Sequence, residues 1–175
     1  MKVSKAPIDG LLIIEPGVFR DPRGMFYEVY AASRYKEHGI PVHFVQDNHS
    51  VSEKGVLRGL HYQINPGQDK LVRVTRGEVF DVAVDIRKQS PTCGKWWGLS
   101  LSETNNLQLY IPVGFAHGFC VLSESAEVLY KCSDYYSPEN ERGIIWNDPE
   151  LAIDWPVENP ILSEKDTAYP RFNKL

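Results

Sequence analysis

Short runs of aliphatic, β-branched and aromatic residues recur along most of the chain and are separated by Gly, Pro, Asn or Asp. Runs of this composition with such boundaries are typical of β-strands. The segment Glu78–Asp85 alternates as a strand does, with Asp81 on the opposite face from Phe80 and Val82. The strands predicted in this way are Gly10–Glu15, Phe26–Tyr30, Val42–Asn48, Val56–Gln63, Lys70–Arg76, Glu78–Asp85, Trp97–Ser102, Leu107–Ile111, Gly118–Leu122 and Glu127–Ser133.

Patterns typical of helices are few. The spacing predicts one helix over Ser33–His38, ended by Gly39, and a short turn near Ser163. Many closely spaced strands with so few helices predict an all-β sandwich or barrel. Because no linker, repeat or low-complexity segment interrupts the pattern, we expect residues 1–175 to form one domain. The tail from Pro149 to Pro170 is too aromatic and aliphatic to be disordered, so we expect the segment from about residue 149 to wrap the barrel.

The composition is that of an ordinary folded domain, with 42% hydrophobic and 24% charged residues. A net charge of −4 without a long basic run gives no indication of a nucleic-acid partner, although a small anionic ligand would need only a local pocket. No stretch approaches the roughly 20 apolar residues that span a bilayer. The N-terminus lacks the apolar core of a signal peptide, so we expect a cytoplasmic protein. Three cysteines without Cys-x-x-Cys spacing argue against a disulfide framework and a zinc ribbon.

Two histidines each lie in a short motif that contains glycine and apolar residues. His61 belongs to Gly55-Val-Leu-Arg-Gly-Leu-His-Tyr-Gln63, and the second motif is Pro112-Val-Gly-Phe-Ala-His117. The pair resembles the two motifs of the cupin superfamily, which normally deliver a histidine–carboxylate metal site. Here Gln63 replaces the second histidine of the first motif, and Lys70 occupies the glutamate position. Two histidines alone would leave a metal under-coordinated, so we expect no metal and favour metal-free acid/base chemistry.

His61 also has a structural interpretation, because a single histidine in a strand is more often structural. Gly59, His61 and Gln63 share one face of the predicted strand. Arg58 is expected to face the opposite way. If the shared face is the barrel interior, His61 points into a cavity and Gly59 leaves room for a ligand. An imidazole in such a place suits a general base.

Other polar residues on the predicted strands leave alternatives open. Lys70 and Arg73 either lie on a solvated face or bind an anion, since an unpaired inward charge is costly. Asp81 and Asp85 share one strand face and are either exposed or functional. Tyr130 alternates with apolar neighbours as a core residue would.

Seven strings occur in order along the chain. They are Phe44-Val-Gln-Asp-Asn48, Leu57-Arg-Gly-Leu-His61, Lys70-Leu-Val-Arg73, Gly114-Phe-Ala-His-Gly-Phe119, Tyr130-Lys-Cys132, Ile145-Trp-Asn-Asp-Pro149 and Leu162-Ser-Glu-Lys-Asp166. Together they resemble one family, the dTDP-4-dehydrorhamnose 3,5-epimerases, over nearly the whole chain from about Gly10 to Asp166. The resemblance implies a cupin-type jelly-roll barrel that uses no metal or other cofactor and works as a homodimer.

The resemblance also implies a reaction, the epimerisation of carbons 3 and 5 of dTDP-4-dehydro-6-deoxy-D-glucose to dTDP-4-dehydro-L-rhamnose. The ketone acidifies the protons on both carbons, so a base can remove one and an acid can return it to the opposite face. By the same resemblance His61 is the base, and Asp166 holds its imidazole. Tyr130 is the acid on the other face. Lys70 would stabilise the enolate oxygen with a fixed positive charge.

A nucleotide-binding set follows from the same resemblance. Arg23 and Arg58 suit the diphosphate through their forked donors, and Tyr136 would stack on the thymine. Arg23 lies in the turn Asp21-Pro-Arg-Gly24, from which it would reach the partner subunit's site. The substrate-binding positions implied are Arg23, Glu28, Gln46, Asn48, Arg58, His117, Tyr136, Glu141 and Lys165.

Three other interpretations stay open on the sequence. A relative could invert only carbon 3 or carbon 5 of a related nucleotide-bound 4-keto deoxysugar, and nothing in the His61, Asp166 and Tyr130 set separates the two cases. A metal-dependent cupin enzyme is disfavoured by Gln63 and Lys70. A binding module without catalysis is the third alternative.

Overall fold

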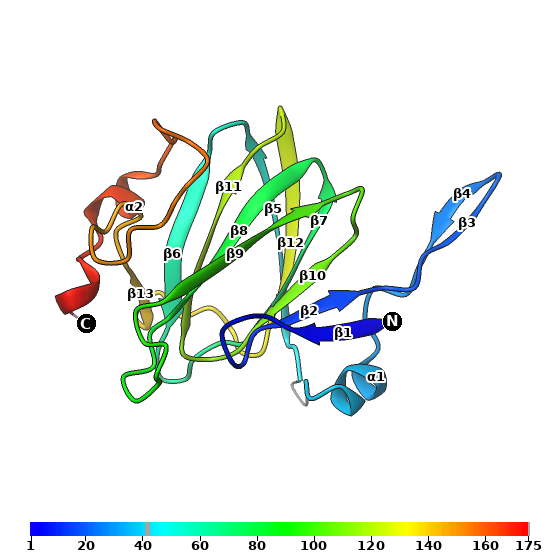
Figure 1. The fold of residues 1–175 in the computed structure, drawn as a ribbon, viewed down its shortest axis with the longest axis horizontal. Coiled ribbons are helices and arrows are strands. Elements are labelled where there is room, and N and C mark those ends of the chain that lie inside the picture. Colours follow the sequence, from blue (N-terminus) through cyan, green and yellow to red (C-terminus); the bar gives the residue numbers. More distant parts are fainter. Residues whose placement is uncertain (41–42, 175) are drawn as a thin grey trace.

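The computed structural model describes residues 1–40 and 43–174. Two antiparallel sheets face each other and form the body of the molecule (Figure 1). The first sheet has six strands in the order β1 (Lys2–Lys5), β2 (Leu12–Glu15), β10 (Gln108–Ile111), β7 (Lys70–Arg76), β12 (Ser125–Cys132) and β5 (Gln46–Glu53). The second has five in the order β13 (Glu141–Gly143), β6 (Leu57–Gln63), β11 (Phe115–Val121), β8 (Glu78–Asp85) and β9 (Trp96–Ser102).

The main hydrophobic core lies between the two sheets. Val72 and Leu109 of the six-stranded sheet belong to one buried cluster with residues of the five-stranded sheet, namely Val79, Ala83 and Phe119. Alternate residues of each strand supply this layer, because successive side chains of a strand point to opposite faces. The predicted all-β fold is confirmed, as a double-sheet jelly roll.

The outer face of the five-stranded sheet is covered by the C-terminal part of the chain (Figure 1). Leu151 and Trp155 pack there in a cluster with Leu57, Val82 and Val84. Both faces of β8 are therefore buried, including Asp81 and Asp85, which lie on the same face as the core residues Val79 and Ala83. That the whole chain forms one domain stays a prediction, which this packing supports.

The edge strands are the elements that the sequence predicted least well. The strand predicted over Val42–Asn48 lies later, as β5, and Val42 is outside the described residues. β5 lies at the edge of its sheet, and all but one of its residues are half-buried or exposed. β1, at the other edge, was not predicted at all. Hydrophobic patterning thus located the central strands and the edge strand β9, but it missed β1 and β13 and displaced β5, where few side chains need to be apolar.

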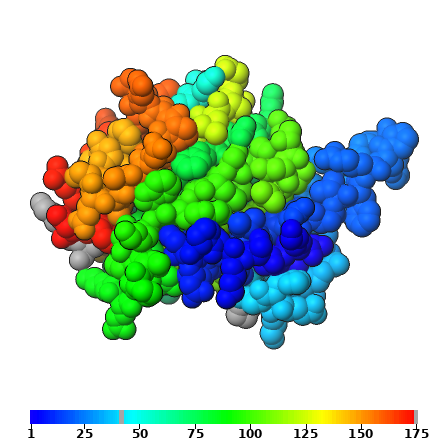
Figure 2. Space-filling model, viewed as in Figure 1, coloured from blue at the N-terminus to red at the C-terminus, as the bar shows by residue number. Residues whose placement is uncertain are grey.

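A small hairpin stands away from the body of the molecule (Figures 1 and 2). Its strands β3 (Phe19–Asp21) and β4 (Gly24–Phe26) pair with each other, so the strand predicted over Phe26–Tyr30 is wrong beyond its first residue. Phe19 is 71% exposed and Phe26 is 73% exposed. Large aromatic side chains concentrated on a projecting hairpin are typical of a surface that another molecule covers.

The helices are short. α1 (Ala32–Glu37) confirms the helix predicted over Ser33–His38, and Gly39 follows it with a φ of 84°. α2 (Glu164–Ala168) begins after Ser163, where a turn was predicted. The hydroxyl oxygen of Ser163 accepts a hydrogen bond from the N–H of Asp166 at 3.2 Å, which caps the helix. In the part of the chain that the structure describes, no helix is long and apolar enough to cross a membrane.

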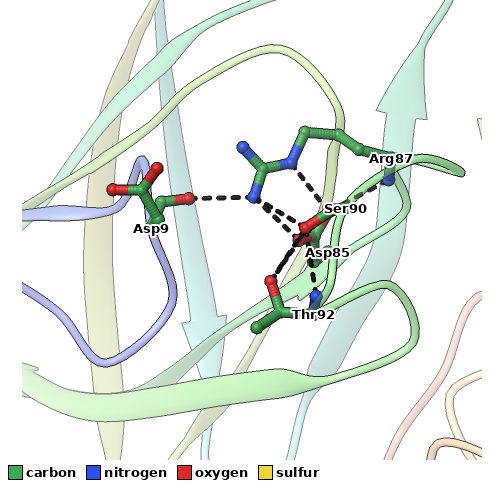
Figure 3. A network of polar contacts seen from close by, with 5 residues as sticks. All are labelled: Asp9, Asp85, Arg87, Ser90 and Thr92. Carbon is green, nitrogen blue, oxygen red and sulfur yellow. Dashed lines mark hydrogen bonds and ion pairs between the residues drawn. The ribbon is translucent and has the colours of Figure 1, made fainter.

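Asp85, at the end of β8, is fully buried, so the alternative that it is exposed is wrong. Figure 3 shows its carboxylate inside a polar network. Arg87 donates to it through Nε at 2.8 Å and Nη2 at 2.7 Å, and the hydroxyls of Ser90 and Thr92 each donate at 2.6 Å. Burial by itself raises the pKa of a carboxyl, but these hydrogen bonds outweigh it and hold the pKa of Asp85 well below its usual range. Because Arg87 also donates to the carbonyl of Asp9 at 2.9 Å, the network ties the loop after β8 to the N-terminal segment.

Candidate active site

A pocket of about 290 Å³ opens between the two sheets. β6 contributes His61 from the five-stranded sheet, whereas β7 and β12 contribute Lys70 and Tyr130 from the six-stranded sheet. Residues of opposing sheets therefore meet around one space. The lining residues are Gln46, Asn48, His61, Tyr62, Gln63, Gln68, Lys70, Tyr130, Tyr136 and Glu141.

His61 is paired with a carboxylate from the far end of the chain. Its Nε2 lies 2.6 Å from Oδ1 of Asp166 in α2. The side chain of His61 is 28% exposed and that of Asp166 only 5%. A carboxylate can only accept a hydrogen bond, so the proton of the neutral imidazole is assigned to Nε2, and Nδ1 is the nitrogen that can take up another. The pair is thus arranged as a base with a charged partner behind it.

The course of β6 differs from a regular strand at Gly59. His61 pairs with His117 of β11, and Arg58 pairs with Phe119, so two residues of β6 oppose the single residue Gly118. Since His117 and Phe119 share a face, the extra residue places Arg58 on the same side as His61. The prediction that they face opposite ways is wrong.

The role expected for Gly59 also changes. A Cβ on Gly59 would lie 2.6 Å from Cα of Gly118, so the space at Gly59 admits the neighbouring backbone and no ligand. The close contact of the two glycines is what the irregular pairing of β6 and β11 requires.

Lys70 and Tyr130 face the pocket together. Nζ of Lys70 lies 5.9 Å from the centre of the Tyr130 ring. Burial lowers the pKa of Lys70, and the charges of Cys132, Asp81 and Glu141 oppose this shift. Burial also raises the pKa of Tyr130. The phenol therefore keeps its proton over a wider pH range than a free tyrosine does.

His117 and Asp81 form a second pair, between the sheets. Nε2 of His117 lies 3.0 Å from each carboxylate oxygen of Asp81. Both residues are buried, so the alternative that Asp81 is exposed is wrong, and neither lines the pocket. Sequence reasoning missed this pair, although the signal was present, because Asp81 alternates with Val79 and Ala83 of the core.

A chain of polar contacts follows the rim of the pocket. The hydroxyl of Tyr136 donates to Oε2 of Glu141 at 2.7 Å, and Lys165 pairs with the same oxygen. The backbone N–H of Tyr136 donates to Oε1 of Gln46 at 2.8 Å, and Nε2 of Gln46 donates to Oδ1 of Asn48 at 3.0 Å. Burial by itself raises the pKa of Glu141, but the hydrogen bonds from Lys165 and Tyr136 outweigh it and leave the pKa lowered. Five residues expected to bind the nucleotide are thus connected, and all of them except Lys165 line the pocket.

Three other expected binding residues do not line this pocket. Arg23 is at the tip of the projecting hairpin, where its backbone N–H donates to Oδ1 of Asp21 at 2.8 Å. Glu28 pairs with Arg34. Arg58 donates from Nε to the hydroxyl of Ser52 at 3.0 Å.

The two residues in the cupin ligand positions have other uses. Nε2 of Gln63 donates to the carbonyl of Tyr135 at 3.1 Å, and the N–H of Ser137 donates to Oε1 of Gln63 at 2.9 Å. Gln63 thereby holds the segment that carries Tyr136. Lys70 offers an ammonium, which does not ligate a metal while protonated. Among residues 1–40 and 43–174, no three His, Cys, Asp or Glu side chains are grouped so that they could hold a metal ion.

Fold and pocket together define a class of jelly-roll proteins in which a histidine–carboxylate pair and a tyrosine face one polar pocket. The sequence profile of the dTDP-4-dehydrorhamnose 3,5-epimerase family matches residues 5–174. The chain belongs to this family, whose members are isomerases. The cupin-type fold and the family predicted from the sequence are therefore confirmed.

The relatives include enzymes with two specificities. The chain is 60% identical over 168 residues to the dTDP-4-dehydrorhamnose 3,5-epimerase of Pseudomonas aeruginosa, covering 95% of this chain and 93% of that protein. It is 44% identical over 168 residues to the dTDP-4-dehydrorhamnose 3-epimerase of Streptomyces niveus, covering 95% and 81%. The crystal structure of the Legionella pneumophila dTDP-6-deoxy-D-glucose-3,5-epimerase in complex with dTDP-4-keto-L-rhamnose superposes with a TM-score of 0.96 at 56% identity, covering 98% of this chain and 93% of that one.

Proposed function

We propose that the protein epimerises carbons 3 and 5 of dTDP-4-dehydro-6-deoxy-D-glucose and so forms dTDP-4-dehydro-L-rhamnose for the synthesis of dTDP-L-rhamnose. At each carbon a proton next to the ketone is removed and another is returned to the opposite face. The higher identity to the 3,5-epimerase of Pseudomonas aeruginosa than to the 3-epimerase of Streptomyces niveus supports inversion at both carbons.

One observation carries the proposal: His61 and Tyr130 line the same pocket from opposing sheets. A single base would tend to return the proton to the face from which it took it, and the configuration would not change. An acid on the other side of the ring is therefore needed for inversion. A sugar bound between the sheets would have the imidazole on one face and the phenol on the other.

His61 acts as the base in this proposal. Asp166 orients the imidazole through the 2.6 Å contact and stabilises the imidazolium that forms. The carboxylate is almost fully buried, so water screens its charge little. General acid/base assistance of this kind contributes roughly 10²–10⁴-fold to the rate.

Tyr130 acts as the acid on the other face, and Lys70 stabilises the enolate. The raised pKa of Tyr130 keeps the phenol protonated, which donation to the enolate carbon requires. Lys70 lies beside Tyr130 and supplies a positive charge where the ketone oxygen becomes negative. Asp81, paired with His117 behind the pocket, is one of the negative charges that favour the protonated form of Lys70.

The rim residues bind the nucleotide in this proposal. Gln46, Asn48 and Glu141 line the pocket and offer the nucleotide donors and acceptors, and Lys165 lies beside Glu141. Tyr136 offers a half-exposed ring on which the thymine can stack. Arg58 is near enough to Tyr130 for its charge to act on the phenol, so the diphosphate would lie close to the acid. His117 would support the site from the buried side.

We also propose that the enzyme is a cytoplasmic homodimer. Arg23 and Glu28 lie on or beside the hairpin, outside the pocket of their own chain, whereas Phe19 and Phe26 expose apolar rings there. A second copy that covers these rings would bring Arg23 to its own pocket, where the forked guanidinium suits a diphosphate. Light scattering should give the mass of a dimer. Arg23→Ala should lose activity but remain a dimer.

Deuterium exchange tests the reaction. The protein is incubated in heavy water with dTDP-4-keto-6-deoxyglucose, and incorporation at each carbon is followed by NMR. We expect deuterium at carbons 3 and 5, together with the inverted product. Incorporation at one carbon only would assign the protein to the single-carbon enzymes, and incorporation at neither would exclude the epimerase.

Two other outcomes separate the remaining alternatives. A binding module without catalysis would bind dTDP while His61→Ala retains the full biological activity of the protein. A metal-dependent enzyme would hold stoichiometric metal and lose exchange on treatment with a chelator. We expect His61→Ala to lose activity, and we expect exchange to be unaffected by a chelator.

A further inference from the structure

We infer that Tyr169 positions the imidazole of His61, and that Gly143 provides the space that the Tyr169 ring occupies. The inference rests on the proposed role of His61 as the base. The two ring centres are 5.6 Å apart with their planes at 66°, which is an edge-to-face contact. Tyr169 does not line the pocket, so it contacts the base from outside the space expected for the sugar.

Gly143 lies directly opposite His61 in the pairing of β13 with β6. A Cβ built on Gly143 would come within 2.5 to 2.6 Å of three atoms of the Tyr169 ring. Contacts this short do not occur between real side chains, so no larger residue fits at position 143 while the ring is in place. Gly143 and Tyr169 therefore form a complementary pair beside the base.

The same short segment fixes the imidazole at two points. Asp166 holds Nε2, and Tyr169 follows at the end of α2 and packs against the ring. A single hydrogen bond fixes one atom of an imidazole but leaves the plane of the ring free to turn about it. An edge-to-face contact restricts that rotation, and a base misplaced by about 1 Å can lose up to about 10²-fold in rate.

The segment is itself anchored to the barrel. The N–H of Ile145 donates to the carbonyl of Pro170 at 2.9 Å, and the N–H of Phe172 donates to Oδ2 of Asp148 at 2.9 Å. These bonds follow Tyr169 directly in the chain. The ring is therefore held against His61 by its own backbone as well as by packing.

The ring of Tyr169 is the part that acts in this inference. Its hydroxyl is buried, and its partner among the described residues is Lys165. Burial raises the pKa of the phenol and the charge of Glu141 adds to this, whereas the charge and hydrogen bond of Lys165 both lower it. Lys165 is also paired with Glu141, so the ring does not depend on the hydroxyl for its contact with His61, and phenylalanine should serve in place of tyrosine.

The test compares four variants by deuterium exchange and steady-state kinetics: Tyr169→Ala, Tyr169→Phe, Gly143→Ala and the double variant Gly143→Ala/Tyr169→Ala. We expect Tyr169→Ala to lower kcat roughly 10-fold with KM within about 2-fold, because the base and not the binding rim is disturbed. Tyr169→Phe should retain kcat. Gly143→Ala should lower kcat as Tyr169→Ala does, and the double variant should be no slower than either single variant.

Each outcome decides the inference separately from the proposed function. The wild-type protein must exchange deuterium at the sugar; if it does not, the proposed function fails first. Wild-type activity with an unchanged kcat in Tyr169→Ala would overturn the inference alone. So would a loss in Tyr169→Phe as large as that in Tyr169→Ala, or additive losses in the double variant. Unfolding curves of all four variants identify any that are slow only because they are partly unfolded, and Tyr169→Phe keeps the comparison informative if Gly143→Ala does not fold.

Discussion

Two buried carboxylates, Asp85 and Asp166, have opposite surroundings. Asp85 receives hydrogen bonds from Arg87, Ser90 and Thr92 and is fully enclosed (Figure 3). Asp166 receives one side-chain contact among the described residues, from an imidazole that is itself partly exposed to the pocket. A carboxylate with every lone pair occupied can only hold structure together. A carboxylate with one charged partner can also respond when that partner gains or loses a proton.

Asp85 is therefore suited to stabilise the fold, whereas the His61–Asp166 pair is suited to proton transfer. Full hydrogen bonding makes the ionised form of Asp85 permanent at neutral pH. The His61–Asp166 pair gains its value only when the imidazole is protonated during the reaction. We therefore expect substitutions at the first group to change the free energy of unfolding, and those at the second to change the rate.

His61→Gln should have the largest effect. The amide Nε2 can still donate to Asp166, but glutamine cannot take up a proton, so exchange should fall by about 10⁴-fold. His49, which is half-exposed on β5, provides the matched control His49→Gln, which should exchange at the wild-type rate. Residual exchange within tenfold of wild type would show that His61 is not the base, and the contrast between Asp166 and Asp85 would then have no basis.

Asp166→Asn should lower the rate by about 10³-fold. The amide can donate to the imidazole and so favours the wrong tautomer, and it cannot stabilise the imidazolium. The free energy of unfolding should change by less than about 1 kcal/mol, because only one side-chain contact is altered. A large loss of stability with little loss of rate would place Asp166 in the same class as Asp85.

Tyr130→Phe should separate two steps that other variants change together. Without the phenol, His61 can still remove and return a proton on its own face, so exchange should stay within about 10-fold of wild type. Completed inversion should fall by roughly 10²-fold. Tyr135→Phe is the control, since that ring is exposed and outside the pocket lining. Equal falls in exchange and inversion would count against Tyr130 as the acid.

Asp85→Asn should lower the free energy of unfolding by roughly 3 kcal/mol at neutral pH and leave kcat nearly unchanged. Because the folded-state pKa of Asp85 lies below its unfolded value, its stabilisation is fully present above the unfolded pKa. That stabilisation is lost as the pH falls toward the folded pKa. Urea unfolding between neutral and acid pH should therefore show a flatter pH dependence in the variant, and parallel curves would contradict the assignment.

Thr92→Val should have the smallest effect. It removes one of the hydroxyl donors to Asp85 while keeping the shape of the side chain, so the free energy of unfolding should fall by about 1 kcal/mol. Exchange at both carbons should proceed at the wild-type rate. A rate change in this variant would show that the Asp85 network and the His61–Asp166 pair are coupled, whereas we expect them to be independent.

The central strands and the helices could be predicted because their signals are local. The alternation in Glu78–Asp85 and the polar cap at Ser163 are each read from a few neighbouring residues. The edge strands β1 and β5 could not be predicted in this way, because most of their side chains are at least partly exposed and need no apolar pattern. The family resemblance, and not periodicity, predicted pocket residues such as Lys70, Tyr130 and Tyr136. It also named Arg23, Glu28, Arg58 and His117, which do not line the pocket.

The all-β fold and the family could be inferred from the sequence, because alternation and short motifs are properties of neighbouring residues. That Arg58 and His61 lie on the same side of β6 is visible only in the folded chain, because the extra residue of β6 is defined by its pairing with β11. The same is true of the contact between Gly143 and Tyr169. The pairing of His61 with Asp166, 105 residues apart, was implied by the family resemblance, but no strand or helix pattern indicated it. Contacts of this kind depend on how distant segments pack, and no local pattern contains that information.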